Sequence, residues 1–230
     1  MQRLLRSEQV ISKLLLPTAA ALGAVVHPER ADLVGITSEI TGLWKYKRLA
    51  SQLQNREGAQ GVLTRCPQLS QDSLVRARAC SPGTLGHAYA TFMDNRHFQP
   101  TDRPPVSFIY DNHSWIAATR VREIHDILHV LFACPTTLRG ELALKAIEYV
   151  QYGIPAHWAS VYFASSRLPV AERNFFMHHL LPWALRAGSK ATNLLEIHYE
   201  AHFDSPLIEL RSKWNVEQLT LDALDEPSGA

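Results

Sequence analysis

The segment from His125 to Glu141, HDILHVLFACPTTLRGE, places two histidines, an aspartate and a glutamate in a run that is otherwise mostly apolar. His125 and His129 are four residues apart, so on an α-helix their rings share one face, about one turn apart. That spacing suits two imidazoles that bind one metal ion. The four polar groups are therefore either a metal site or ordinary helix residues that happen to be close in sequence.

Glu141 can meet the two histidines only if the chain turns back between them. On one continuous helix, Glu141 would lie about 160° around the axis from His125 and about 24 Å along it. Cys134-Pro135-Thr136-Thr137 supplies a turn, because a proline ends the first helix and a threonine can cap the second. Glu141 then falls in the opening turn of an antiparallel helix, where it can face the histidines.

Asp126 lies about 100° around the helix from His125, at the edge of the face that carries the histidines. It can reach a metal from there, or it can orient a ligand imidazole from outside the ligand set. Two histidines and two carboxylates without a nearby thiolate favour zinc, iron, manganese or cobalt over a cysteine-type structural zinc site.

The alternative to a metal site is a pair of hydrogen-bonded core histidines, with Glu141 bridged to Lys145 four residues further along its helix. An isolated HxxxH would favour that alternative. The His-Asp doublet, the proline turn and Glu141 together favour the metal site.

Helical patterns dominate the rest of the chain, and no Asn-Gly or Asp-Gly hairpin turn separates alternating runs. The predicted helices are 36–53, 85–98, 114–132, 137–152 and 170–188, the last starting after Pro169 and stopping near Gly188. We therefore predict an all-α fold, with a metal site on an antiparallel helix pair. Residues 1–220 form a single mainly helical domain, and residues 221–230 form a flexible C-terminal tail.

The composition is that of a globular protein, with 46% hydrophobic and 20% charged residues. The net charge is only +1 and no block of five basic residues occurs, so we expect no nucleic-acid partner. Cys66, Cys80 and Cys134 contain no CxxC pair, which favours a reducing compartment.

The N-terminal run Leu14–Val26 is apolar and follows three basic residues, as in a short secretory signal. Its 13 residues and internal proline make it too short for a transmembrane helix. No convincing cleavage site follows, so we expect a core helix or a membrane-facing helix that begins the domain.

A second HxxxH, formed by His198 and His202, brackets Glu200 near the C-terminus. No second acid-bearing turn follows this pair, so we predict ordinary surface or core histidines. Aromatic side chains at helical spacing usually pack inside a protein, and we expect the same of this set: Trp158, Tyr162, Phe163, Phe175 and Phe176.

HDILH, followed after eleven residues by Glu141, resembles the HDxxH-plus-glutamate signature of the fourth-numbered coenzyme Q (ubiquinone) biosynthesis protein family. The similarity continues through Pro135-Thr136, EYVQYGIP (Glu148–Pro155) and LLPWALRAG (Leu180–Gly188). Upstream, GTLGHAYATFMDNRHFQPTDRPP also resembles the family pattern, so the likeness covers about residues 10–215.

The resemblance implies a mostly helical fold and the metal ligands His125, Asp126, His129 and Glu141. The metal is usually taken to be zinc in this family, with Fe2+, Mn2+ or Co2+ as other options. The implied role is in ubiquinone biosynthesis, through decarboxylation and hydroxylation at C1 of the ring, through organisation of the biosynthetic complex, or both.

The implied partners are a polyprenylated quinone precursor, the other enzymes of ubiquinone biosynthesis and a peripheral membrane contact; a homodimer is also open. Since the sequence shows no organellar presequence, we expect a bacterial cytoplasmic protein, peripheral to the inner face of the cell membrane.

Whether the protein is an enzyme stays open at this point. Zinc has no redox chemistry and could only polarise the carboxylate or hydroxyl of the ring, whereas iron would make oxygen activation simpler. As an enzyme, the protein would be a metal-dependent lyase or oxidative decarboxylase of a prenylated 4-hydroxybenzoate-derived ring. The alternatives are a non-catalytic prenyl-lipid-binding scaffold with a structural metal, and an HD-type metal-dependent phosphohydrolase.

Overall fold

The computed structural model describes residues 31–55 and 69–220. Within these ranges the chain forms helices and no strand, apart from an isolated bridge between Thr84 and Pro206. The predicted all-α fold is therefore confirmed. The apolar run Leu14–Val26, Cys66 and the predicted tail 221–230 lie outside the described residues.

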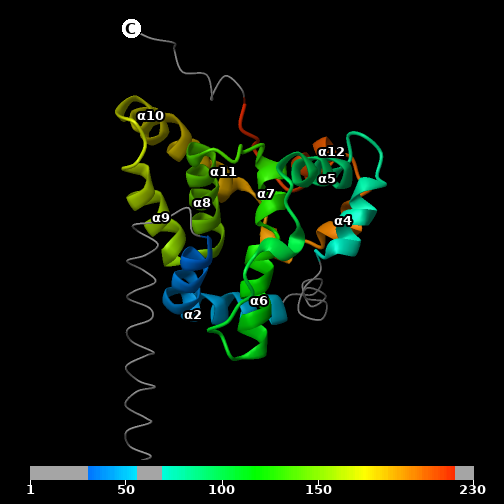
Figure 1. The fold of residues 1–230 in the computed structure, drawn as a ribbon, viewed down its shortest axis with the longest axis horizontal. Coiled ribbons are helices and arrows are strands. Elements are labelled where there is room, and N and C mark those ends of the chain that lie inside the picture. The colour runs from blue at the N-terminus through cyan, green and yellow to red at the C-terminus, as the bar shows by residue number, and fades with distance from the viewer. Residues whose placement is uncertain (1–30, 56–68, 221–230) are drawn as a thin grey trace, which may run out of the picture.

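Figure 1 shows the helices in chain order. They are α2 (Ala31–Asn55), α4 (Gln71–Arg78), α5 (Leu85–Arg96), η1 (Pro100–Asp102), α6 (Asn112–Glu123), α7 (His125–Phe132), α8 (Leu138–Tyr152), α9 (Pro155–Ser165), α10 (Val170–Phe175), η2 (Phe176–Leu180), α11 (Leu181–Lys190), η3 (Leu194–Glu196), η4 (Tyr199–His202) and α12 (Leu207–Lys213).

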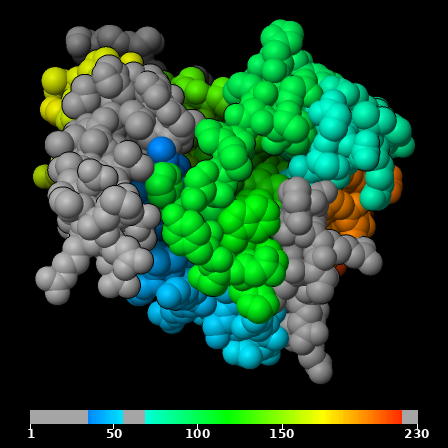
Figure 2. All heavy atoms as spheres, turned by 60° about the horizontal axis from the view of Figure 1, so that its bottom comes forward, coloured from blue at the N-terminus to red at the C-terminus, as the bar shows by residue number. Residues whose placement is uncertain are grey.

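The two helices of the predicted site, α7 and α8, lie in the centre of the molecule (Figure 1). α8 packs against α9 and α11 on one side, and α7 packs against α5 on the other. α2 crosses α6 and also contacts α9. α2 and α6 reach the surface at one end of the molecule (Figure 2). Side chains that project from α7 and α8 toward each other therefore lie in the interior of the bundle or at its edge.

Two of the predicted helices are divided in the structure. The predicted helix 114–132 consists of α6 and α7, which meet at Ile124. The predicted helix 170–188 consists of α10, the π-helical turn η2 and α11, which ends at Lys190. Pro182 lies in the first turn of α11 and has no N–H, so it cannot donate to the carbonyl of His178 in the preceding turn.

The end of α7 is built as a left-handed cap. Ala133 has φ of 55°, and the backbone N–H of Cys134 donates to the carbonyl of His129 at 3.1 Å. This cap turns the chain away from the helix axis before Pro135. The predicted end of the first site helix is thus confirmed.

The start of α8 is fixed by a threonine cap and a glycine. The Thr137 hydroxyl accepts a hydrogen bond from the Gly140 N–H at 3.4 Å, as predicted for a capping threonine. A Cβ on Gly140 would lie 2.0 Å from the carbonyl oxygen of Pro135. Because that neighbour is backbone, the tight return of the chain requires glycine here, and it places Glu141 in the first turn of α8.

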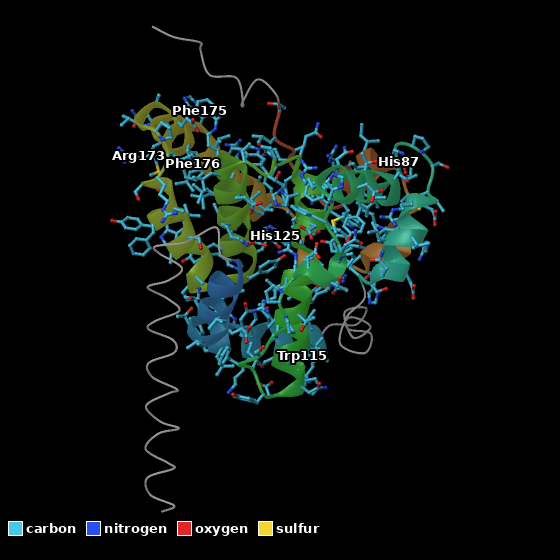
Figure 3. The ribbon with its side chains drawn as sticks, in the orientation of Figure 1. His87, Trp115, His125, Arg173, Phe175 and Phe176 are labelled. Atoms are coloured by element: carbon cyan, nitrogen blue, oxygen red, sulfur yellow. The ribbon has the colours of Figure 1, made fainter. Side chains whose placement is uncertain are left out.

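The prediction that the aromatic residues pack inside is right for Phe176, which is fully buried, and wrong for α9. Trp158, Tyr162 and Phe163 are 38%, 70% and 46% exposed. α9 instead buries a stripe of smaller side chains against α8 and α2: His157, Val161 and Ala164. Trp158 lies at the edge of this stripe, with its ring 5.2 Å from that of Tyr149 on α8, and Tyr162 and Phe163 face away from it. Phe175 and Phe176 lie at the far end of the α9–α10 pair (Figure 3).

Candidate metal centre

His125 and His129 are buried and turn the same ring nitrogen toward each other, with 3.2 Å between their Nε2 atoms. The other nitrogen of each ring is already bonded. Nδ1 of His129 lies 3.0 Å from the carbonyl oxygen of Cys134. A carbonyl can only accept, so this Nδ1 carries the hydrogen, and in the neutral ring Nε2 is left with a lone pair.

The same logic applies to His125. Its Nδ1 lies 2.8 Å from Oε1 of Glu148, a carboxylate that also accepts a hydrogen bond from Lys145 at 2.6 Å. The Nδ1–H of His125 therefore donates to Glu148, and its Nε2 presents a lone pair. Two facing lone pairs cannot bond to each other, but both can bind one cation. Figure 3 places His125 between α7 and α8 at the centre of the bundle.

Glu141 completes this group from α8. Its Oε1 lies 3.1 Å from Nε2 of His129, and its Oε2 lies 3.4 Å from Nε2 of His125. One donor atom from each of the three residues lies within 4.8 Å of the others. Donors bound about 2.0–2.2 Å from a tetrahedral metal lie roughly 3.3–3.6 Å apart. The observed separations of 3.2, 3.1 and 3.4 Å are close to these, so the donor set fits a divalent metal such as zinc.

The pKa values of Glu141 and His125 are both shifted by the contacts within this group. Burial alone would raise the pKa of Glu141, but its contacts with the rings of His125 and His129 hold this pKa well below its usual range. Burial and Lys145 oppose protonation of His125, yet Glu148 and Glu141 raise its pKa. Both shifts show that the carboxylates favour a positive charge at the two rings, which either a proton on Nε2 or a metal ion bound by its lone pair can supply.

Asp126 is buried beside the histidines but is not part of this group of three. Its carboxylate is bound by both ends of the Arg103 guanidinium, with the Nε–Oδ2 contact at 3.2 Å. The structure thus brings together three of the four residues that the sequence pointed to, and it places Asp126 against the loop that follows α5.

The structure adds a buried carboxylate that the sequence analysis did not include. Glu148 lies seven residues after Glu141, on the same face of α8, and it pairs with Lys145 instead of leaving that lysine to Glu141. This i, i+4, i+7 pattern is a signal that could have found it. His157, buried on α9 with its Nδ1 3.8 Å from Oε2 of Glu148, has no comparable signal because it comes from another helix.

The fold and this site define a class of all-α proteins with a candidate His/His/Glu metal centre. Residues 6–220 match the family described as Coenzyme Q (ubiquinone) biosynthesis protein Coq4, and the chain belongs to this family. It is therefore a protein of ubiquinone biosynthesis, as the resemblance implied.

Curated relatives and a solved structure agree with this assignment. The chain is 34% identical over 212 residues to a mitochondrial ubiquinone biosynthesis protein COQ4 homolog of Bos taurus, covering 91% of the chain and 80% of that protein. It is 29% identical over 214 residues to the mitochondrial homolog of Aedes aegypti, covering 92% and 78%. The crystal structure of a proposed ubiquinone biosynthesis protein from Nostoc punctiforme shares the fold, with a TM-score of 0.66 at 20% identity over 93% of this chain and 99% of that one.

The expected location, peripheral to the inner face of a bacterial cell membrane, is wrong. Relatives from Aedes aegypti, Bos taurus and Mus musculus are all named mitochondrial proteins. The expectation depended on the lack of a recognisable presequence, and an addressing segment is separate from the folded domain that these relatives share. Within the described ranges, no helix combines the length and the apolar character needed to cross a membrane.

Proposed function

We propose that His125, His129 and Glu141 bind a divalent metal, and that this site acts on C1 of a polyprenylated ring intermediate of ubiquinone biosynthesis. The observation that carries the proposal is the orientation of the histidines. Both rings are tied through Nδ1, and both Nε2 lone pairs and the Glu141 carboxylate converge on one point.

The residues around this point supply a site with one open side. The histidines are buried, whereas the Glu141 side chain is 35% exposed, so a ring can approach from the Glu141 side. When bound, the metal would act as a Lewis acid toward the carboxylate or hydroxyl of the ring. The Arg103 guanidinium, which is paired with Asp126, also interacts electrostatically with Glu148 and Glu141 at the site.

The exposed aromatic face of α9 supports two further parts of the proposal, an isoprenoid-binding surface and a peripheral membrane contact. Trp158 and Tyr162 carry large apolar bodies with polar tips, a type of side chain that is enriched where protein meets lipid headgroups.

The experiment combines metal analysis with function in cells. Wild type, His129→Ala and Glu141→Ala are purified for metal analysis and expressed in a quinone-deficient host, whose ring intermediates are measured by mass spectrometry. His178→Ala and Glu209→Ala, both at exposed positions, are matched controls. We expect the two site variants to lose metal and to accumulate a ring intermediate that keeps its C1 carboxylate, while the controls behave as wild type. Normal quinone levels in both site variants would contradict a role of the site in the chemistry.

Two other outcomes identify the alternatives. If the site variants lose metal, thermal stability and partner binding together, the metal holds the fold of a lipid-binding scaffold. If purified protein releases phosphate from nucleotides and His125→Ala abolishes that release, the site belongs to an HD-type phosphohydrolase.

A further inference from the structure

A carboxylate outside the three-residue group is hydrogen-bonded to one of its histidines. Glu148 is only 1% exposed, and it extends from α8 toward α7, with Oε1 2.8 Å from Nδ1 of His125. We propose that Glu148 is the positioning residue that holds His125 in its metal-binding tautomer. This inference rests on the proposed metal site and adds to it a residue that does not touch the metal.

The geometry gives the reason. An imidazole binds a metal through an unprotonated nitrogen, and the hydrogen bond made by its other nitrogen decides which one that is. The Glu148 carboxylate accepts the Nδ1–H of His125, so the Nε2 lone pair faces His129 and Glu141. With the hydrogen on Nε2 instead, His125 would present a donor to the metal and could not bind it.

The surroundings of Glu148 keep its carboxylate in place. Its second oxygen accepts a hydrogen bond from Lys145 at 2.6 Å, and Nδ1 of His157 lies 3.8 Å from the same oxygen. A buried carboxylate is costly unless it is paired and hydrogen-bonded, and here Lys145 supplies the ion pair and His125 supplies a hydrogen bond. The ion pair with Lys145 fixes one oxygen, which leaves the other directed at His125.

Asp126 provides the contrast. It is adjacent to His125 in the sequence, but its carboxylate is bound by Arg103 rather than by an imidazole. The carboxylate that orients His125 therefore comes from 23 residues further along the chain.

The first test compares Glu148→Gln with Glu39→Gln. Both glutamates are 1% exposed and hydrogen-bonded, but Glu39 bonds to Arg122 and to the backbone of Ser107 and Phe108, away from the three-residue group. Zinc affinity is measured by chelator competition, and the visible spectrum of the Co2+-loaded protein reports ligand geometry. We expect Glu148→Gln to weaken zinc binding by about 10–100-fold and to shift the cobalt spectrum. Glu39→Gln should lower the melting temperature while leaving affinity and spectrum unchanged. A Glu148→Gln protein with wild-type affinity and spectrum would overturn the proposal.

A second readout needs no metal. Nitrogen-15 NMR of the histidine rings in metal-free protein reports which nitrogen of His125 carries the hydrogen. We expect the Nδ1–H tautomer in wild type and a loss of that preference in Glu148→Ala and Glu148→Gln. If wild type binds no zinc or cobalt, the proposed metal function fails and this tautomer measurement alone decides the role of Glu148. An unchanged tautomer in both variants would overturn that role.

Discussion

The chain contains two HxxxH segments with the same spacing, and they have different surroundings. His125 and His129 lie on the α-helix α7, where residues four apart are about 40° apart around the axis. His198 precedes the 3-10 helix η4 and His202 ends it. With three residues per turn, positions four apart in such a helix are about 120° apart. The backbone, rather than the spacing, decides which pair can converge.

The acids of the two segments are used differently as well. Glu141 reaches both Nε2 atoms of the first pair across a turn. Glu200, between the histidines of the second segment, lies 3.4 Å from Arg120, a fully buried side chain. His202 packs edge-on against Trp214. An acid near two histidines therefore indicates a metal site only when its carboxylate is not already paired with a buried cation.

The largest expected effect is a loss of folding stability at the second HxxxH segment, caused by Arg120→Ala. Arg120 donates to Glu123, Glu200 and the carbonyl of Ile197, so its loss leaves two partly buried carboxylates without their cation. We expect a loss of roughly 3–5 kcal/mol in the free energy of unfolding, measured by urea denaturation. Arg76→Ala, which removes an exposed pair with Asp204, is the control and should cost no more than about 1 kcal/mol. A loss below that of the control would show that Glu200 is not committed to the fold.

The next largest effect is expected for Gly140→Ala, in the turn that brings Glu141 back to His125 and His129. Gly140→Ala would drive a Cβ into the carbonyl of Pro135, so the turn must open and carry Glu141 away from the histidines. We expect about 1–3 kcal/mol of lost stability together with weaker zinc binding. Gly35→Ala is the matched helical control, because there the nearest atoms belong to the side chain of Arg122. Unchanged zinc affinity in Gly140→Ala would show that metal binding does not depend on the geometry of this turn.

The smallest expected effect is a pH dependence of folding stability that comes from His202, in the second HxxxH segment. Burial, and then the charges of Lys213 and His198, lower the pKa of His202 below its usual value. A group whose folded pKa is depressed contributes stability above its unfolded pKa, about 6.5, and that stability is lost as the pH falls through its folded pKa. His202→Gln should therefore lose less stability than wild type between pH 7.5 and pH 5, as measured by thermal melts. Parallel curves would contradict the assignment; His178→Gln is the exposed control.

The sequence was sufficient for features that depend on neighbouring residues. The helical spacing of His125 and His129, the cap at Thr137 and the need for a turn before Glu141 are all local, and the structure contains them. The family resemblance follows from the same motif and is confirmed by the match over residues 6–220.

Features that depend on how helices pack could not be predicted in the same way. The partner of Asp126 is Arg103, 23 residues earlier, and no local pattern connects the two. The exposed aromatic face of α9 follows from its orientation against α8 and α2, since either side of that helix contains apolar residues. The division of the predicted helix 114–132 at Ile124 had no proline or glycine to mark it.

The metal site is tested most directly by a zinc titration of wild type, His129→Ala and His202→Ala, with affinity measured by chelator competition. We expect one tight site in wild type and in His202→Ala. In His129→Ala we expect zinc affinity to fall by at least about 100-fold, beyond the 10–100-fold loss that follows when only an outer partner is removed. Equal affinities in wild type and His129→Ala, or an equal loss in the two variants, would refute a metal site at His125, His129 and Glu141.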